Sequence, residues 1–199
     1  MSIRLVNVTA GYDSQTVLNR LSFTFTEHGV IQVTGPSGCG KTLLLRVLAG
    51  LNRPYSGKIE GLDGLRVSMA FQEDRLLPWC TALENVRCVL KTDEESEKLA
   101  LSWLSRMELR DVAHSYPSEL SGGMQRRLAL ARALAYGGDL LLLDEPFNGL
   151  DKELRGRIAA HIKNAAPLIV LVSHEKEDAE LLDAMPVALG DMISGETLS

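Results

Sequence analysis

The hydrophobic and polar positions of the chain form two strand-like patterns. Residues Ile3–Val8 and Leu21–Phe25 alternate apolar with polar side chains, which is the period of strands that are buried on one face. Wholly apolar runs follow at Val30–Val33, Leu140–Leu143 and Pro167–Val172, and such runs are typical of parallel strands that are buried on both faces. The pattern predicts an N-terminal antiparallel β layer followed by a mainly parallel core sheet.

Helical patterns alternate with the later strands. Lys41–Ala49 is a helix-forming run that Gly50 closes, and Met124–Tyr136 and Asp151–Asn164 also have the composition and spacing of helices. Strands that alternate with helices predict the α/β class, with helices covering both faces of the sheet.

A largely helical pattern occupies the middle of the chain, from about residue 73 to 137. Thr81 and Glu84 form a predicted capping box before Ala82–Leu90, and apolar residues recur through Glu95–Met107. The region predicts an α-helical subdomain inserted into the core, within a single domain that spans residues 1–199.

Composition narrows the class of protein. The 199 residues are 45% hydrophobic, which is enough for one sizeable core, and the net charge of −5 argues against a nucleic-acid partner. No run approaches the roughly 20 apolar residues that span a bilayer, and the N-terminus alternates like a strand. Three cysteines without paired C-x-x-C spacing indicate reduced thiols. These features predict a cytosolic protein.

One stretch carries an unambiguous chemical pattern. Residues 35–42 read GPSGCGKT and match G-x-x-x-x-G-K-[ST], with an apolar strand before them and a helix after them. Backbone N–H groups in such a loop cradle phosphate, Lys41 would reach the β- and γ-phosphates, and the Thr42 hydroxyl would bind Mg²⁺. The alternative is a glycine-rich turn without function. The predicted phosphate-binding set is Gly35, Pro36, Ser37, Gly38, Cys39, Gly40, Lys41 and Thr42.

Further candidates lie at predicted strand ends. Asp144 and Glu145 follow four leucines, so Asp144 would hold Mg²⁺ directly or through water, and Glu145 would polarise the attacking water. His174 follows another apolar strand and would bond a γ-phosphate oxygen or the water. Tyr12, predicted in a loop at 11–13, would stack on a base. The alternatives are a helix cap or surface carboxylate for an acid, a packed histidine and a packed tyrosine.

Taken together, these residues resemble the ATP-binding subunit of ABC transporters over essentially the whole chain. The motifs are Tyr12, GPSGCGKT, Gln72, LSGGMQRR at Leu120–Arg127, LLLLDE at Leu140–Glu145, Gly149–Asp151 and His174. Within the family, the segments Phe71–Glu73, Leu76–Trp79 and Glu84–Val86 are similar to the nitrate, sulfonate and taurine importer group. The resemblance implies a P-loop NTPase core.

The resemblance also implies roles for single residues. Tyr12 would stack adenine of ATP, Gln72 would sense Mg²⁺ and water, Glu145 would be the base and His174 the switch. Ser121, Gly122, Gly123 and Asp151 would contact nucleotide, the first three closing over the γ-phosphate on a second copy in a head-to-tail dimer. Hydrolysis would therefore depend on dimerisation.

For partners, the resemblance implies an importer's motor subunit, peripheral on the inner face of the cell membrane, with permease subunits and a solute-binding protein. Residues 73–79, EDRLLPW, place Leu76, Leu77 and Trp79 around a proline, and exposed apolar clusters mark interaction sites, so this segment is the predicted permease contact. A different reading of this segment is that its apolar residues fill the hinge between the core and the helical insert, which is the expectation for Leu77 taken alone. The alternative is a soluble ABC ATPase of translation, DNA repair or chromosome structure. Such proteins carry two ATPase units or a long coiled coil, whereas this chain has neither.

Two positions depart from the family pattern. Arg126 stands where glutamine is usual, and Asn148 stands where serine or glycine often precedes Gly149. We expect these departures to alter the rate of ATP hydrolysis and not to abolish it.

Only 25 residues follow His174, so no regulatory C-terminal domain is expected.

Overall fold

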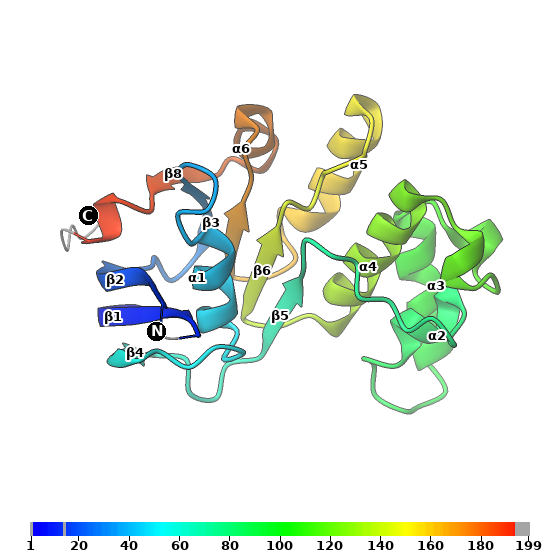
Figure 1. Ribbon diagram of the computed structural model, residues 1–199. Helices are drawn as coiled ribbons and strands as arrows, with labels where there is room; N and C mark the ends of the chain where they lie inside the picture. Colours follow the sequence, from blue (N-terminus) through cyan, green and yellow to red (C-terminus); the bar gives the residue numbers. More distant parts are fainter. Residues whose placement is uncertain (1, 14, 194–199) are drawn as a thin grey trace.

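Two β-sheets form the framework of the protein in a computed structural model, which describes residues 2–13 and 15–193 (Figure 1). The first sheet is antiparallel, with strand order β2-β1-β4, and the second is parallel, with order β5-β6-β7-β3-β8. The predicted antiparallel layer and parallel core sheet are both confirmed. The strands are β1 (Arg4–Tyr12), β2 (Gln15–Thr24), β3 (Gly29–Thr34), β4 (Ser56–Glu60), β5 (Val67–Ala70), β6 (Leu140–Asp144), β7 (Leu168–Val172) and β8 (Met185–Ala188).

Helices connect the strands and build a separate cluster at one end of the molecule. In Figure 1, α2, α3 and α4 lie together beyond β5, where the helical insert is predicted. The Thr81–Glu84 capping box is present, because Glu84 N–H donates to Thr81 Oγ1 and Thr81 N–H donates to the Glu84 carboxylate. The α-helices are α1 (Lys41–Leu48), α2 (Ala82–Arg87), α3 (Ser96–Arg106), α4 (Gly122–Tyr136), α5 (Lys152–Ile162) and α6 (Lys176–Leu182), with short 3₁₀ turns at Arg110–Val112, Pro117–Glu119 and Asp191–Ile193.

Strand β6 divides the hydrophobic core into two parts. Leu140 and Leu142 pack with α1 and the antiparallel sheet, whereas Leu141 and Leu143 pack with the helical cluster and α5. Successive side chains of a strand point to opposite faces, so a run of four leucines serves both layers. The strand is therefore held from both sides at the point where Asp144 and Glu145 follow it.

The C-terminal end of helix α4 is attached to the parallel sheet. The Ser68 hydroxyl of β5 donates to the carbonyl oxygen of Ala133 at 2.6 Å, and the Arg66 guanidinium donates to the carbonyl oxygen of Tyr136. The N-terminal end of the helix is capped by Ser121, whose hydroxyl accepts from Met124 N–H at 3.3 Å. The two ends of α4 are thus anchored differently.

The structure corrects two expectations about the elements. Tyr12 does not lie in a loop, because it is the last residue of β1 and pairs with Gln15. Helix α6 and strand β8, which follow His174, had no predicted counterpart. Strand β8 has only four residues and contains Pro186, at the edge of the sheet where a missing N–H is tolerated. Within the described residues, no helix combines the length and apolar character needed to cross a membrane.

Candidate functional site

The loop between β3 and α1 curls because its glycines adopt conformations that other residues avoid. Gly38 and Gly40 have φ of 77° and 109°, in the left-handed region. A Cβ on Gly40 would lie 2.6 Å from Leu18 Cδ2, so a side chain there would force the Leu18 side chain to shift. Lys41 is buried, and its ammonium donates to the carbonyl oxygens of Gly35 at 2.8 Å and Pro36 at 3.0 Å. The loop therefore holds a positive charge inside a ring of backbone.

A cleft of about 510 Å³ opens over this loop, at the carboxyl ends of the parallel strands. Ligands of open α/β sheets bind at this edge. The cleft brings together residues from the two sheets, the loop and α1, although they are far apart in sequence. It is lined by Tyr12, Val17, Ser37, Gly38, Gly40, Lys41, Thr42, Leu43, Gln72, Asp144, Glu145, Asn148, Val172 and His174.

Asp144 is the last residue of β6 and is only 1% exposed. Burial raises the pKa of its carboxyl, and a hydrogen bond with the Thr42 side chain opposes that rise. One oxygen, Oδ1, is buried without a hydrogen-bond partner. A buried carboxylate oxygen beside a threonine hydroxyl is the donor chemistry that Mg²⁺ prefers, so the residues present fit a magnesium ion.

Glu145 follows directly and is held in a strained backbone conformation. Its φ is 50°, a value that a residue with a side chain adopts only where its surroundings enforce it. Its N–H donates to the carbonyl oxygen of Val172 at 2.8 Å, which fixes it to the end of β7. Burial raises the pKa of the carboxyl, and Oε1 lies 3.5 Å from His174 Nε2. A carboxylate with a raised pKa, next to an imidazole, can accept a proton from water.

Comparison with known proteins assigns the family. The sequence family described as ABC transporter matches residues 18–148. This chain belongs to the ABC transporter family. The aliphatic sulfonates import ATP-binding protein SsuB 1 of Rhodococcus jostii is 40% identical over 202 residues, covering 96% of this chain and 80% of the relative. The Fe(3+) ions import ATP-binding protein FbpC of Brucella abortus is 39% identical over 195 residues, covering 89% of this chain and 55% of that protein.

Solved structures of ABC transporter cassettes have the same fold. The ATP-binding cassette MJ0796, in a dimeric post-hydrolysis state with ADP and Pi, superposes with a TM-score of 0.83 at 28% identity. The alignment covers 94% of this chain and 95% of that one. A second structure of MJ0796, also dimeric, gives the same TM-score at 29% identity over the same shares of the two chains. The fold is therefore that of an ATP-binding cassette.

Some residues that the ABC transporter resemblance implicates lie outside the cleft. Ser121–Gly123 form the N-terminal end of α4 and do not line it. A Cβ on Gly123 would lie 3.5 Å from the carbonyl oxygen of Gly149, so these two motifs are neighbours. Asp151 caps α5, since its Oδ1 accepts from Leu154 N–H at 3.0 Å. Within one subunit, neither Ser121–Gly123 nor Asp151 is among the residues that line the cleft.

Other predicted residues contribute differently than expected. Cys39 packs beside the apolar core and is not among the residues that line the cleft. Gly35 and Pro36 contribute carbonyl oxygens to Lys41, as described above. Tyr12 is 41% exposed at the mouth of the cleft, and its hydroxyl accepts from Arg46 at 3.5 Å.

The segment predicted to meet a permease is only partly exposed. Trp79 is 72% exposed, whereas Leu76 packs against the core and Leu77 is half-buried. The expectation of an exposed apolar cluster is therefore wrong for Leu76, whereas the partial burial of Leu77 agrees with the hinge role expected for that residue alone. The fully buried Asn85 holds the turn, because its amide donates to the carbonyls of Leu77 and Cys80 at 3.1 and 3.0 Å.

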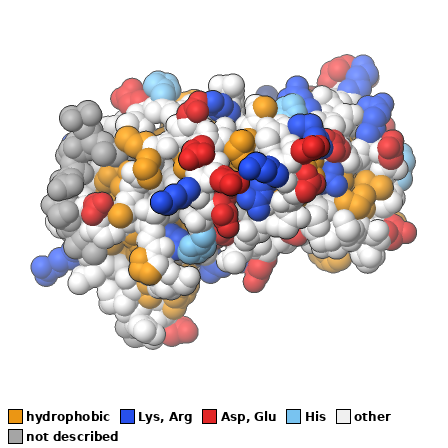
Figure 2. Space-filling model, turned by 90° about the horizontal axis from the view of Figure 1, so that it is seen from above, with side chains coloured by type: hydrophobic (Ala, Val, Ile, Leu, Met, Phe, Trp, Pro, Cys, Tyr) orange, Lys and Arg blue, Asp and Glu red, His pale blue; other side chains and the backbone are white. Residues whose placement is uncertain are grey.

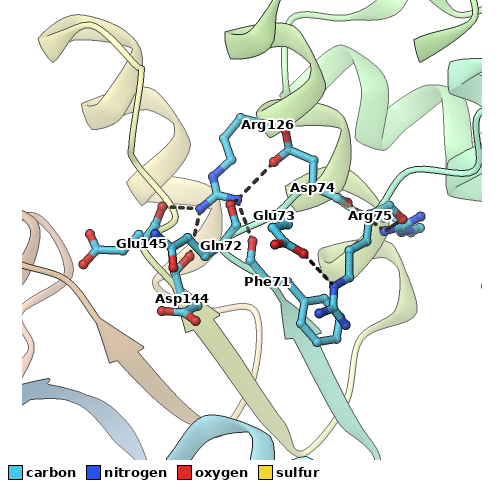
Figure 3. Close-up of polar contacts among 9 residues, drawn as sticks. Phe71, Gln72, Glu73, Asp74, Arg75, Arg126, Asp144 and Glu145 are labelled. Carbon is cyan, nitrogen blue, oxygen red and sulfur yellow. Dashed lines mark hydrogen bonds and ion pairs between the residues drawn. The ribbon is translucent and has the colours of Figure 1, made fainter. Parts of the chain in front are cut away.

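The sequence identifies Arg126 only as a departure from the family pattern, whereas the structure places it beside the two acids. Arg126 lies in α4 with its guanidinium between Gln72, Asp144 and Glu145 (Figure 3). Its position four residues before Leu130 and seven before Ala133 places it on the apolar face of the helix. A charged residue on an apolar face is the signal that would have identified it.

Proposed function

We propose that the protein is the ATP-hydrolysing subunit of an ABC importer, and that it acts through separate permease subunits. The observation that carries the proposal is that β6 delivers Asp144 and Glu145 into the cleft formed by the phosphate loop. Relatives at 40% and 39% identity are named as ATP-binding proteins for import of aliphatic sulfonates and of Fe(3+) ions. Because these names differ in solute, we propose no particular solute.

In the proposed reaction, the loop from Gly35 to Thr42 binds the phosphates of ATP, and Lys41 exchanges its two carbonyl acceptors for phosphate oxygens. Thr42, Gln72 and Asp144 would hold Mg²⁺, which neutralises phosphate charge when bound. Glu145 accepts a proton from the attacking water, and its raised pKa suits a base that must operate near neutral pH. His174 orients the Glu145 carboxylate, while Tyr12 stacks on adenine.

The active form in this proposal is a dimer of two copies. Ser121–Gly123 lie at a helix N-terminus outside their own cleft, and such N–H groups favour an anion. They would cover the γ-phosphate bound to the partner copy, with Asp151 beside the interface. The dimeric cassette MJ0796 supports this arrangement.

Gly122 allows a clean test of the dimer. A Cβ there would meet nothing within 4 Å in the subunit itself, so Gly122→Asp disturbs only what a partner brings. We expect it to abolish ATP-dependent dimerisation in analytical ultracentrifugation and to reduce hydrolysis. Gly156→Asp is the matched control, because Gly156 is a helical glycine in α5 with equally open space. Dimerisation by the Gly122 variant would contradict the proposed interface.

The permease contact in the proposal is the segment from Glu73 to Trp79, with Trp79 as its anchor. The exposed indole and the rigid turn behind it support a docking site. The subunit would lie on the cytoplasmic face of the membrane, held by the permease, with a solute-binding protein on the other side. Acidic and basic side chains are interspersed on the described part of the face in Figure 2, and we propose no role in nucleic-acid binding.

The decisive experiment is a steady-state assay of phosphate release with MgATP. The wild-type protein should hydrolyse ATP, lose activity in excess EDTA, and lose nucleotide binding in Lys41→Ala. Binding is followed separately with a fluorescent ATP analogue. A well-folded protein that binds no ATP, or that releases phosphate equally well without Mg²⁺, would overturn the proposal.

A further inference from the structure

Arg126 is almost completely buried between the helical cluster and the parallel sheet. Its side chain is 5% exposed, and among the described residues its only carboxylate partner is Asp74, at 3.0 Å from Nη1. Figure 3 shows the guanidinium between the segment that follows β5 and the segment that ends β6. A buried charge carries a desolvation penalty, so stability alone is a poor reason for an arginine at this position.

The two terminal nitrogens of the guanidinium bind different segments. Nη1 donates to the carbonyl oxygens of Phe71 at 2.6 Å and Gln72 at 3.0 Å. Nη2 donates to the carbonyl oxygen of Asp144 at 2.8 Å and also to that of Glu145. One planar group therefore ties the main chain of Gln72 to the main chain of both acids, although none of these side chains is its partner.

A different side chain would not make the same connection. A glutamine, which the family resemblance leads one to expect here, carries both of its N–H donors on one nitrogen. A lysine has a single charged nitrogen on a flexible stem, whereas the arginine fork presents two nitrogens in fixed geometry. Only the arginine can hold both pairs of carbonyls at once.

The backbone that Arg126 holds needs support. Glu145 has a φ of 50°, and such strained residues keep their conformation only where neighbouring groups enforce it. Gln72 is exposed at the cleft, and no helix or strand contains it. The orientation of both side chains therefore depends on how their carbonyls are fixed.

We propose that Arg126 is a positioning residue for ATP hydrolysis, which sets the main chain of Glu145 and Gln72 so that their side chains meet the attacking water. The role rests on the proposed ATPase function. Arg126 does not line the cleft, so it does not touch the nucleotide, and its effect is carried by Glu145 and Gln72.

The test separates kcat from nucleotide affinity. Arg126→Met should lower kcat for MgATP roughly a hundredfold, the effect expected when a reacting group is misplaced by about 1 Å. The dissociation constant for ATP should change less than about threefold, because the phosphate loop is untouched. Arg126→Lys preserves charge and loses the fork, so it should also be impaired, and it supplies a folded variant where Met is not tolerated. Arg126→Gln installs the residue usual in the family and should lose less activity than Arg126→Met.

Arg132 provides the matched control on the same helix. Its Nη2 donates to the carbonyl oxygens of Asp74 at 3.1 Å and Arg75 at 2.9 Å, so it anchors the same segment. None of its described hydrogen bonds involves Gln72, Asp144 or Glu145. Arg132→Met should leave kcat within about threefold of the wild type, although it loses three hydrogen bonds of its own.

A double-mutant cycle with Glu145→Gln tests whether Arg126 acts through the base. Single-turnover hydrolysis of the Glu145→Gln protein should fall less than about threefold further when Arg126→Met is added, since no base remains to be positioned. Multiplicative losses, or a wild-type kcat in all three Arg126 variants, would overturn the positioning role. A wild-type protein that does not hydrolyse ATP would instead overturn the proposed function.

Discussion

The cleft and the turn at Leu77–Cys80, which carries Trp79, depart from ordinary packing in opposite ways. In the cleft, Asp144 and Glu145 are buried carboxyls, each with one oxygen that lacks a hydrogen-bond partner. At the turn, a tryptophan is exposed while the amide of Asn85 behind it makes every hydrogen bond that its donors allow. Buried polar groups without partners and exposed large apolar groups are the two informative departures from ordinary packing.

The difference teaches how each region is prepared for its ligand. The cleft leaves one oxygen of Asp144 and one of Glu145 without a hydrogen-bond partner. In the proposed reaction these oxygens bind a cation and the attacking water. The turn satisfies its backbone internally and leaves the Trp79 side chain uncovered, and in the proposed function a permease subunit covers it. Only six residues lie between Gln72 of the cleft and Trp79 of the turn, and one of them, Asp74, is held by Arg126.

The largest expected effect tests the cleft. Glu145→Gln keeps the size of the side chain and removes the base, so hydrolysis should fall about 10² to 10⁴-fold while ATP binding persists. Phosphate release and equilibrium binding are measured on the same preparation. Glu175→Gln is the control, since Glu175 is exposed nearby and does not line the cleft. Activity within a few-fold of wild type would remove Glu145 from its assigned role.

The next effect tests the rigidity of the turn. Asn85→Ala removes an amide that is fully buried and that also accepts from Leu77 N–H at 2.8 Å. Unsatisfied buried groups cost about 1 to 3 kcal/mol each, so the free energy of unfolding should fall by about 2 to 3 kcal/mol. Urea denaturation followed by circular dichroism measures the loss. A loss below about 0.5 kcal/mol, which is the scale of an ordinary surface substitution, would show that the turn is not held by Asn85.

A smaller effect, in binding rather than folding, is expected at Trp79. Trp79→Ala should weaken permease binding by about 2 kcal/mol, roughly thirtyfold, because buried interface tryptophans dominate such contacts. The unfolding midpoint should not change, since the indole is exposed. Tyr55→Ala, another exposed aromatic at 51%, is the control in co-purification with the permease and in transport assays. Unfolding of the Trp79 variant, or normal uptake, would contradict a docking role.

The smallest effect is a gain in stability. Burial raises the pKa of Asp144, so its charged form destabilises the nucleotide-free fold at pH values above its unfolded pKa of about 3.9. Asp144→Asn should therefore raise the unfolding free energy by about 1 kcal/mol at neutral pH, roughly 2 to 4 °C in Tm. The gain should shrink as the pH falls through the raised pKa, because the wild-type carboxyl then becomes neutral. An equal gain at pH 4 and pH 7.5 would contradict an electrostatic origin.

The elements that the sequence predicted well have strong local patterns. A run of four leucines followed by two acids predicted β6, a capping box predicted α2, and the structure has both. The phosphate loop was predicted from the spacing of its motif residues, because its glycines permit the positive φ that the loop needs. Helix α6 and strand β8 were missed because neither has such a boundary: no side chain caps the start of α6, and Pro186 interrupts the strand pattern of β8.

Contacts between distant residues could not be predicted in the same way. No local pattern says that the guanidinium of Arg126 meets carbonyls 18 and 54 residues away. The burial of Leu76 depends on the packing of the whole helical cluster, and the inward position of Cys39 depends on β3, α1 and their neighbours. Such features follow from tertiary packing, which propensity and period do not encode.

Helix α4 connects the residues that would meet a partner with the acids of the cleft. Gly122 and Arg126 are four residues apart on this helix, which is about 6 Å along its axis, and Arg126 holds the carbonyl oxygen of Glu145. In the proposed dimer, a partner bound at Ser121–Gly123 would therefore touch the same helix that positions the proposed base.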